Sequence, residues 1–130
     1  MKDYWDSSAV IEACHSPALR FRLHRERGFT RTHTLAEVFS TLTGGNLAFR
    51  LGADDAAKTV ASLAADLDFQ DLAATDVLKA LKEARKKGVR GGRIHDYLHA
   101  VAAEKSGARK LLTLDRNDFN DLTTVEIEAV

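Results

Sequence analysis

The segment Lys2-Asp-Tyr-Trp-Asp6-Ser-Ser8 places an acidic residue at the end of a short apolar run, with two hydroxyl side chains directly after it. We interpret residues 2–6 as a buried strand, because the run is too short for a helix. Serine is a favoured N-cap residue, so Ser7 or Ser8 is predicted to begin a helix. The segment therefore predicts a strand that runs into an acidic residue and then into a helix.

The segment Lys110-Leu-Leu-Thr-Leu-Asp115 repeats this pattern, and residues 110–114 are predicted to form a second strand that ends in an acid. Apolar spacing, caps and breaking residues predict the remaining elements. The remaining strands are predicted at 29–33 and 67–72, with an edge strand at 124–127. Helices are predicted to begin at Ser7 or Ser8, at Pro17, at Thr34, at Ala53, at Thr75 or Asp76, and at Ile94. The last two helices run to Lys87 and Gly107, and the helix from Thr34 is broken at Gly44-Gly45-Asn46. Alternation of short strands with helices predicts one α/β domain over residues 1–130. It has a mostly parallel sheet of four to five strands and helices on both faces, in an α/β/α sandwich.

The composition is that of an ordinary globular protein of 130 residues, 45% hydrophobic and 29% charged. No apolar stretch approaches the roughly 20 residues that a membrane span requires, and the first residues lack the apolar core of a signal peptide. One cysteine, Cys14, excludes an internal disulfide. We therefore expect a cytoplasmic protein without a membrane segment.

The charges balance, with 19 basic and 19 acidic residues, which argues against a simple basic nucleic-acid binder. Their distribution is uneven, however. One basic cluster contains Arg20, Arg22 and Arg25, and a second basic run ends with Arg90 and Arg93. These arginines are candidates to hold a polyanion, and the alternative is that both runs are solvated helix faces.

Four acidic residues are predicted to lie at strand C-termini or helix N-termini, namely Asp6, Glu37, Asp96 and Asp115. This is the edge at which open α/β sheets place their ligands. Gathering carboxylates in one cleft is costly unless a positive group neutralises them. Ligand sets made only of oxygen suit Mg²⁺ or Mn²⁺. The four acids therefore predict a divalent metal site.

Each of these acids also has a purely structural interpretation. Asp6 and Asp96 would be favourable at a helix N-terminus through the helix dipole. Glu37 would complete a capping box with Thr34, three residues earlier. Asp115 would be an ordinary turn former. The metal hypothesis depends on all four acids together.

Four motifs resemble the PIN-domain family, and in particular the VapC-like toxins of toxin–antitoxin modules. The motifs are Tyr4-Trp-Asp6-Ser-Ser-Ala-Val-Ile, Leu35-Ala-Glu37-Val-Phe-Ser-Thr-Leu, Ile94-His-Asp96-Tyr-Leu-His-Ala-Val-Ala and Leu112-Thr-Leu-Asp115-Arg-Asn-Asp118-Phe. They occur in the family's order and span nearly the whole chain. The resemblance implies a Mg²⁺- or Mn²⁺-dependent endoribonuclease that hydrolyses RNA with a metal-activated water.

By the same resemblance, Asp6, Glu37 and Asp96 form the catalytic, metal-binding acidic triad, and Asp115 is the fourth acid. Thr113 and Asp118 are auxiliary residues, and the candidate RNA-binding residues are Arg20, Arg22, Arg25, Arg90 and Arg93. The implied partners are an RNA substrate, a cognate antitoxin protein and a second copy of the chain in a homodimer. His95 and His99 are one helical turn apart, but no third ligand accompanies them, so we interpret them as surface histidines and not as a zinc site.

Three alternatives stay open at this point. The first is a PIN-type RNA-processing or structure-specific nuclease outside a toxin–antitoxin module. The second is a receiver-like signalling domain, which the sequence disfavours because Asp6-Ser-Ser lacks an adjacent acid pair after the first strand. The third is a non-catalytic RNA-binding or scaffold protein whose acids serve only as caps.

Overall fold

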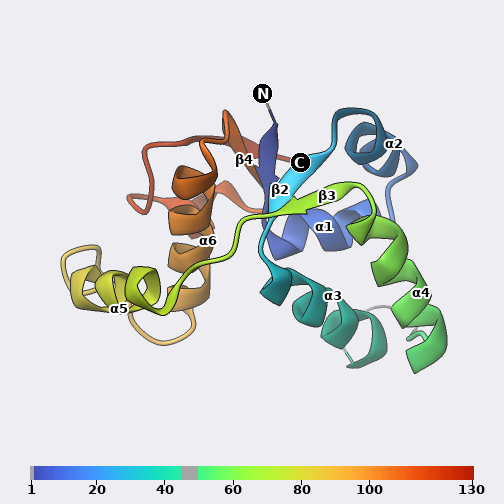
Figure 1. Cartoon of the computed structure of the whole chain (residues 1–130), viewed down its shortest axis with the longest axis horizontal. Helices are drawn as coiled ribbons and strands as arrows, with labels where there is room; N and C mark the ends of the chain where they lie inside the picture. The colour runs from blue at the N-terminus through green and yellow to red at the C-terminus, as the bar shows by residue number, and fades with distance from the viewer. Residues whose placement is uncertain (1, 45–49) are drawn as a thin grey trace.

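Five short parallel strands form one sheet in the computed structural model, which describes residues 2–44 and 50–130 (Figure 1). They are β1 (Asp3–Trp5), β2 (Gly28–Thr30), β3 (Leu67–Phe69), β4 (Lys110–Thr113) and β5 (Glu126–Ala129). Their order across the sheet is β3-β2-β1-β4-β5, and every neighbouring pair is parallel. All five C-terminal strand ends therefore lie at the same edge, with β1 and β4 side by side at the centre.

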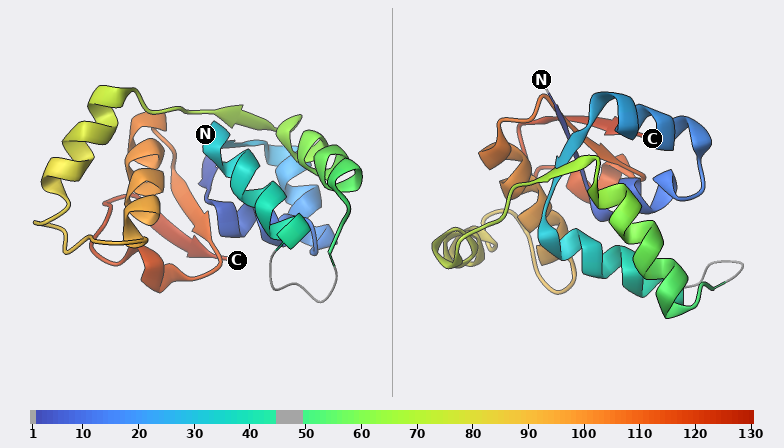
Figure 2. Two further views of the ribbon diagram at one scale, coloured as in Figure 1. Left: turned by 90° about the horizontal axis from the view of Figure 1, so that it is seen from below. Right: turned by 45° about the vertical axis from the view of Figure 1, so that its right-hand side comes forward.

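Helices cover both faces of this sheet. One group contains α1 (Ser7–Ala13), α2 (Pro17–Glu26), α3 (Thr32–Gly44) and α4 (Ala53–Ala64). The other contains α5 (Ala74–Glu83) and α6 (Arg93–Ser106), followed after β4 by the short 3₁₀ helix η1 (Arg116–Phe119). Figures 1 and 2 show the two groups on opposite sides of the strands. The predicted three-layer α/β fold is confirmed. None of the helices in the described part of the chain is long and apolar enough to cross a membrane.

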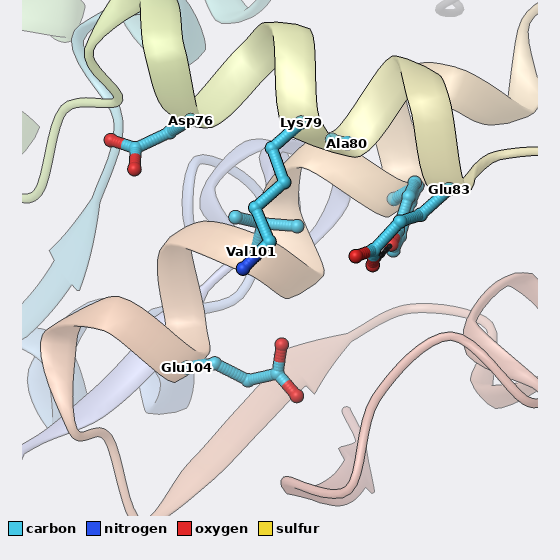
Figure 3. A pocket seen from close by; sticks show the side chains of 7 residues that line it. Asp76, Lys79, Ala80, Glu83, Val101 and Glu104 are labelled. Atoms are coloured by element: carbon cyan, nitrogen blue, oxygen red, sulfur yellow. Dashed lines mark hydrogen bonds between the residues drawn. The ribbon is translucent and has the colours of Figure 1, made fainter.

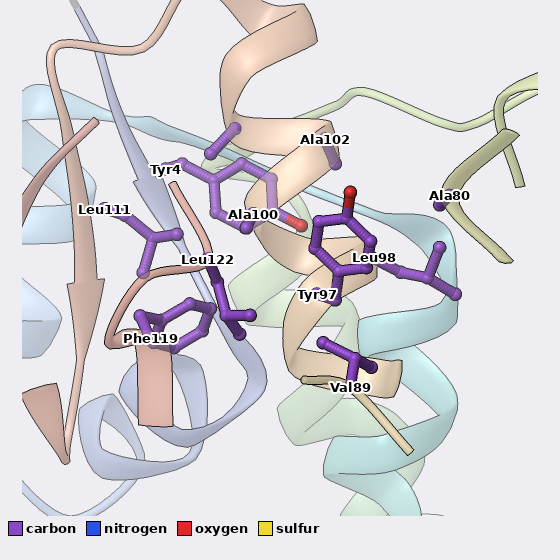
Figure 4. Packing of buried hydrophobic residues seen from close by; sticks show 11 residues of the cluster. Tyr4, Ala80, Val89, Tyr97, Leu98, Ala100, Ala102, Leu111, Phe119 and Leu122 are labelled. Atoms are coloured by element: carbon purple, nitrogen blue, oxygen red, sulfur yellow. The ribbon is translucent and has the colours of Figure 1, made fainter. Parts of the chain in front are cut away.

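Neighbouring strand residues point to opposite faces and so supply two separate cores. Tyr4 and Leu111 pack with the α5 and α6 side chains (Figure 4), whereas Trp5 and Leu112 pack with those of α1 to α4. All four of these strand residues are buried. Burial of a large apolar side chain contributes roughly 1.5–3 kcal/mol, so the two central strands hold both helical layers to the sheet.

Strand β2 begins at Gly28 and ends at Thr30, so the predicted strand 29–33 was displaced toward the C-terminus. Gly28 pairs with Asp3 of β1. A Cβ atom at this position would lie 2.5 Å from Cδ1 of Trp5, which is closer than real Cβ contacts. The glycine therefore belongs to the strand because it leaves room for the buried indole.

Helix α3 begins at Thr32, two residues before the predicted cap Thr34. The carboxylate of Asp71 accepts hydrogen bonds from the backbone N–H and the hydroxyl of Thr32, both at 2.9 Å. The Thr34 hydroxyl is buried and accepts a hydrogen bond from Thr30 Oγ1. The capping-box interpretation of Glu37 was therefore wrong, because Glu37 lies within α3 and not at its third residue.

Other element boundaries also differ from the prediction. Helix α1 begins at Ser7 and its N-cap is Asp6, not Ser7 or Ser8. Helix α5 begins after Ala73, whose N–H donates to Asp76, and it ends at Glu83 and not Lys87. Strand β3 stops at Phe69, and β5 covers 126–129 in place of 124–127. In the predicted break after α3, Gly44 is the last residue of the helix, whereas residues 45 and 46 lie outside the described residues.

Candidate active site

Asp6 directly follows β1 and is fixed by three hydrogen bonds. Its Oδ1 atom accepts from the Ala9 backbone N–H at 2.8 Å and from the Ser8 hydroxyl at 2.7 Å. Its Oδ2 atom accepts from the Thr113 hydroxyl at 2.6 Å. The residue is only 4% exposed. Asp6 is thus both the cap of α1 and a rigidly held carboxylate at the junction of β1 and β4, where Thr113 donates to it.

Asp96 and Asp118 approach the same place from α6 and η1. The pKa of Asp96 is raised to about 6, first by burial and then by the negative charges of Asp118 and Asp6. Burial and the charges of Asp115 and Asp6 raise the pKa of Asp118 as well. The positive charges of His99 and Arg93 oppose the increase at Asp96, and that of Arg93 opposes the increase at Asp118, without cancelling either. Asp6, Asp96 and Asp118 therefore share one region of uncompensated negative charge.

Glu37 lies on the α3 side of this region. Its Oε1 atom is buried, has no hydrogen-bond partner among the described residues, and lies 3.5 Å from Nε2 of His99 and 3.7 Å from Nε2 of His33. Burial acts to raise the pKa of Glu37, but polar contacts with His99 and Ser7 and the charges of the two histidines outweigh it and lower the pKa to about 2. Glu37 is therefore held ionised in a partly enclosed place.

Asp115 follows β4 and, like Asp118, is exposed. It is the N-cap of η1, since its Oδ1 atom accepts a hydrogen bond from the Asn117 N–H at 2.9 Å. The charge of Asp115 raises the pKa of Asp118. The pKa of Asp96, in contrast, is raised by the charge of Asp118 and not by that of Asp115. In the structure, the auxiliary acid Asp118 is therefore the one whose charge acts on Asp96.

The donor set fits a divalent cation in its chemistry. In the residues that the structure describes, no three His, Cys, Asp or Glu side chains stand close enough together to surround a metal ion. One observation nevertheless indicates a lack of positive charge around Asp96. The negative charges of Asp118 and Asp6 contribute to raising its pKa. Such carboxylates are stabilised when a hard cation binds among them.

Three histidines surround the acids. His33 and His95 are exposed and nearly parallel, with ring centroids 6.1 Å apart and an interplanar angle of 16°. This contact joins the first turns of α3 and α6, the helices that carry Glu37 and Asp96. His99 was predicted to be a surface residue, which was wrong, because it is 3% exposed. Helical spacing alone had left open which face of α6 points inward.

The predicted RNA-binding arginines do not form one surface. Arg20 is paired with Asp66 at 2.8 Å, and Arg22 is paired with Asp3 and Glu128. Arg25 is exposed and contacts Glu26 and the ring of Phe21. Asp3 opens β1, so Arg22 lies toward the edge of the sheet opposite Asp6. Arg20 and Arg22 therefore form ion pairs with acidic residues of the fold itself. Of the five arginines, Arg93 alone is close enough to affect Asp96 and Asp118, and Arg90 is exposed in the loop before it.

Two hollows differ in their relation to the acids. One of about 390 Å³ lies beside Glu37 and is also lined by His33, Ser40 and Thr41. Another of about 190 Å³ lies between α5 and α6 (Figure 3), and its lining includes Lys79 and three acids, Asp76, Glu83 and Glu104. None of the four predicted site acids lines the second hollow. Of these two hollows, only the first is lined by one of the four acids, Glu37.

An all-parallel sheet with carboxylates at the C-terminal edge of its central strands defines an α/β domain with an acidic site. The family model described as PIN domain matches residues 4–124. The chain belongs to the PIN-domain family, as the four motifs predicted. PIN domains are generally nucleases that act on nucleic acids and typically bind divalent metals. No match is found among curated proteins.

The repulsion at Asp96 predicts a distinctive pH dependence of stability in metal-free protein. With its pKa raised from 3.8 to about 6, folded Asp96 binds a proton more tightly than unfolded Asp96 does. The contribution of Asp96 to the free energy of unfolding therefore falls as the pH rises from about 4 to about 6. Asp96→Asn removes this loss and is expected to raise Tm at pH 7 by roughly 2–5 °C, a value reduced for partial exposure.

Thermal denaturation in EDTA across pH 4–8 measures this effect. Glu37 has the opposite effect at the acid end of this range, because its pKa is lowered from 4.5 to about 2 in the folded protein. It is present in both proteins, so its contribution cancels when wild type and Asp96→Asn are compared at each pH. A Tm at pH 7 that is unchanged or lower in Asp96→Asn would show that the carboxylate is not repelled by its neighbours.

Proposed function

We propose that the protein is a Mg²⁺- or Mn²⁺-dependent endoribonuclease and the toxin of a toxin–antitoxin module. The observation that carries the proposal is the uncompensated charge shared by Asp6, Asp96 and Asp118 at the edge of a PIN-domain sheet. A group of acids kept only for capping would not need to face one another. Their mutual repulsion costs stability and is the kind of feature that functional sites retain.

The residues proposed to hold the cation are Asp6, Glu37, Asp96 and Asp115, with Asp118 as the auxiliary acid. When bound, a divalent cation offsets charge on phosphate oxygens and makes a bound water nucleophilic near neutral pH. Thr113 and Ser8 would keep Asp6 in one orientation, since both donate hydrogen bonds to it. Glu37 would stay ionised, since its pKa is far below neutrality.

The RNA backbone is proposed to approach along the exposed rim of the site. Arg93 donates to the Asn120 carbonyl oxygen at 2.7 Å, and its charge reaches Asp96 and Asp118. Arg90 is exposed three residues before Arg93, and the stacked rings of His33 and His95 are exposed as well. Positive side chains beside an acidic centre can hold phosphates while the acids hold the metal. The proposal further includes a homodimer, a cognate antitoxin that covers the site, and action in the cytoplasm.

The test is cleavage of a mixed RNA pool by purified protein free of any antitoxin, with Mg²⁺, Mn²⁺ or EDTA. We expect cleavage with either metal and none with EDTA. Asp96→Asn, purified in the same way, is expected to leave the RNA intact, and it controls for contaminating nuclease. Equal cleavage by wild type and variant, or cleavage that persists in EDTA, would refute the proposed site.

The toxin role is tested separately by controlled expression in a bacterial host. Wild type is expected to stop growth, and Asp96→Asn is expected to have no such effect. Metal-dependent cleavage in vitro without growth arrest would favour an RNA-processing nuclease over a toxin.

A further inference from the structure

Three buried polar side chains form a row that ends at Glu37, and the proposed function assigns them no role. Tyr4 of β1, Ser7 of α1 and His99 of α6 are 0%, 8% and 3% exposed. The Tyr4 hydroxyl oxygen lies 2.7 Å from Nδ1 of His99, and the Ser7 hydroxyl oxygen lies 3.1 Å from Nε2. The same Nε2 atom is 3.5 Å from Oε1 of Glu37. The imidazole therefore connects Tyr4 with the Ser7 and Glu37 side of the row.

Both ring nitrogens of His99 have a polar neighbour. Nδ1 faces the Tyr4 hydroxyl, and Nε2 faces the Ser7 hydroxyl and the Glu37 carboxylate. An ionised carboxylate can only accept hydrogen bonds, so it favours a proton on Nε2. The ring therefore presents Nε2–H toward Glu37, while Tyr4 holds its other side.

We propose that His99 is a positioning residue for Glu37. Its Nε2–H faces the carboxylate directly and also through the Ser7 hydroxyl, and so holds the carboxylate toward the other acids of the candidate site. This inference rests on the proposed function, because it takes Glu37 as a group that binds the cation. Residues that orient a metal-binding carboxylate through hydrogen bonds affect metal affinity or activity by 10–100-fold when changed.

A purely structural role explains the arrangement less well. An apolar side chain at position 99 would fill the same space without the cost of burying polar groups. In place of such a side chain, three elements each contribute a buried polar group to a row that ends at one carboxylate. Oε1 of that carboxylate is buried and lies 3.5 Å from Nε2 of His99. Buried polar networks of this kind favour one defined orientation of their members.

The experiment compares two amide substitutions at the same buried position. Gln places its terminal amide near the position of Nε2, whereas Asn places its amide near Nδ1 and leaves no donor toward Glu37. We expect His99→Asn to weaken Mn²⁺ binding by RNA-free protein, measured by calorimetry, roughly 10–100-fold. We expect a comparable loss in kcat for RNA cleavage with little change in KM for RNA. His99→Gln is expected to recover most of both losses.

Equal Mn²⁺ affinity and kcat in wild type and His99→Asn would overturn the proposal. The proposal would also be overturned if His99→Asn and His99→Gln lost Mn²⁺ affinity and kcat equally and had the same lowered Tm. If His99→Asn does not fold, Tyr4→Phe provides the test, because it keeps the ring and removes the hydroxyl that holds Nδ1 of His99. It is expected to weaken Mn²⁺ binding about threefold or more, and an unchanged affinity would count against the proposal.

Glu37→Gln separates a failure of this inference from a failure of the proposed function. If Glu37→Gln binds Mn²⁺ and cleaves RNA as wild type does, Glu37 is not in the site, and the proposed function is wrong at that residue. If Glu37→Gln loses both while the His99 variants keep both, only the positioning role of His99 is refuted.

Discussion

Asp6→Asn is expected to reduce metal-dependent RNA cleavage by roughly 1,000-fold or more while the protein remains folded. Loss of a central carboxylate removes several kcal/mol of charge stabilisation, and each 1.4 kcal/mol corresponds to about tenfold in rate. The fold should survive because an Asn side-chain oxygen can still accept the Ala9 N–H bond that caps α1. The measurements are initial cleavage rates at saturating Mn²⁺ and the Tm of each protein.

Asp66→Asn is the matched control for this variant. Asp66 is a buried aspartate too, but it is paired with Arg20 and His24 on the other side of the molecule. Its loss is expected to lower Tm and leave the cleavage rate per folded molecule unchanged. If Asp6→Asn retained more than about a tenth of the wild-type rate, Asp6 would be a helix cap and not a metal-binding residue.

Glu37→Gln is expected to reduce cleavage by roughly 100-fold and also to lower stability at neutral pH, because it removes a charge that its neighbours stabilise. Glu37 does not cap α3, since the helix begins at Thr32 and its first N–H bonds to Asp71. Gln keeps the size of the side chain and its contacts with Ser7 and His99 but lacks the charge. The paired measurements are the cleavage rate and the free energy of unfolding in denaturant.

A contrary pattern is easily recognised for this residue. A fall in stability of several kcal/mol without a selective loss of activity would mean that Glu37 serves the packing of α3. In that case Asp6, Asp96 and Asp115, with the auxiliary acid Asp118, would have to hold the cation without it.

The fold class could be predicted because it depends on short-range patterns. The apolar runs at 2–6 and 110–114 correspond to β1 and β4, and Gly107 ends α6 with a φ of 72°, as a C-terminal glycine should. Distant contacts were not visible in the same patterns. The start of α3 depends on Asp71, which lies 39 residues after Thr32 in the chain. The residues around Thr32 contain no pattern that predicts a hydrogen-bond acceptor so distant in the sequence.

The acids of the candidate site were predictable as a set, through motifs in the family's order, but their arrangement was not. Sequence spacing cannot show that the charge of Asp118 acts on Asp96 while Asp115 caps η1. It also cannot tell a basic cluster that holds RNA from one that is already neutralised. Arg22 pairs with Glu128, 106 residues away, and this partner becomes apparent only when β5 joins the sheet.

Strand β5 also determines how the protein should be prepared for experiments with metals. It runs parallel to β4, and the Val130 N–H donates to the Thr113 carbonyl at 2.9 Å, while the Thr113 hydroxyl donates to Asp6. A polyhistidine tag attached after Val130 would therefore emerge beside the acids and offer its own imidazoles to the cation. A tag placed before residue 2 would emerge near the beginning of β1, at the opposite edge of the sheet, and would leave the metal measurements undisturbed.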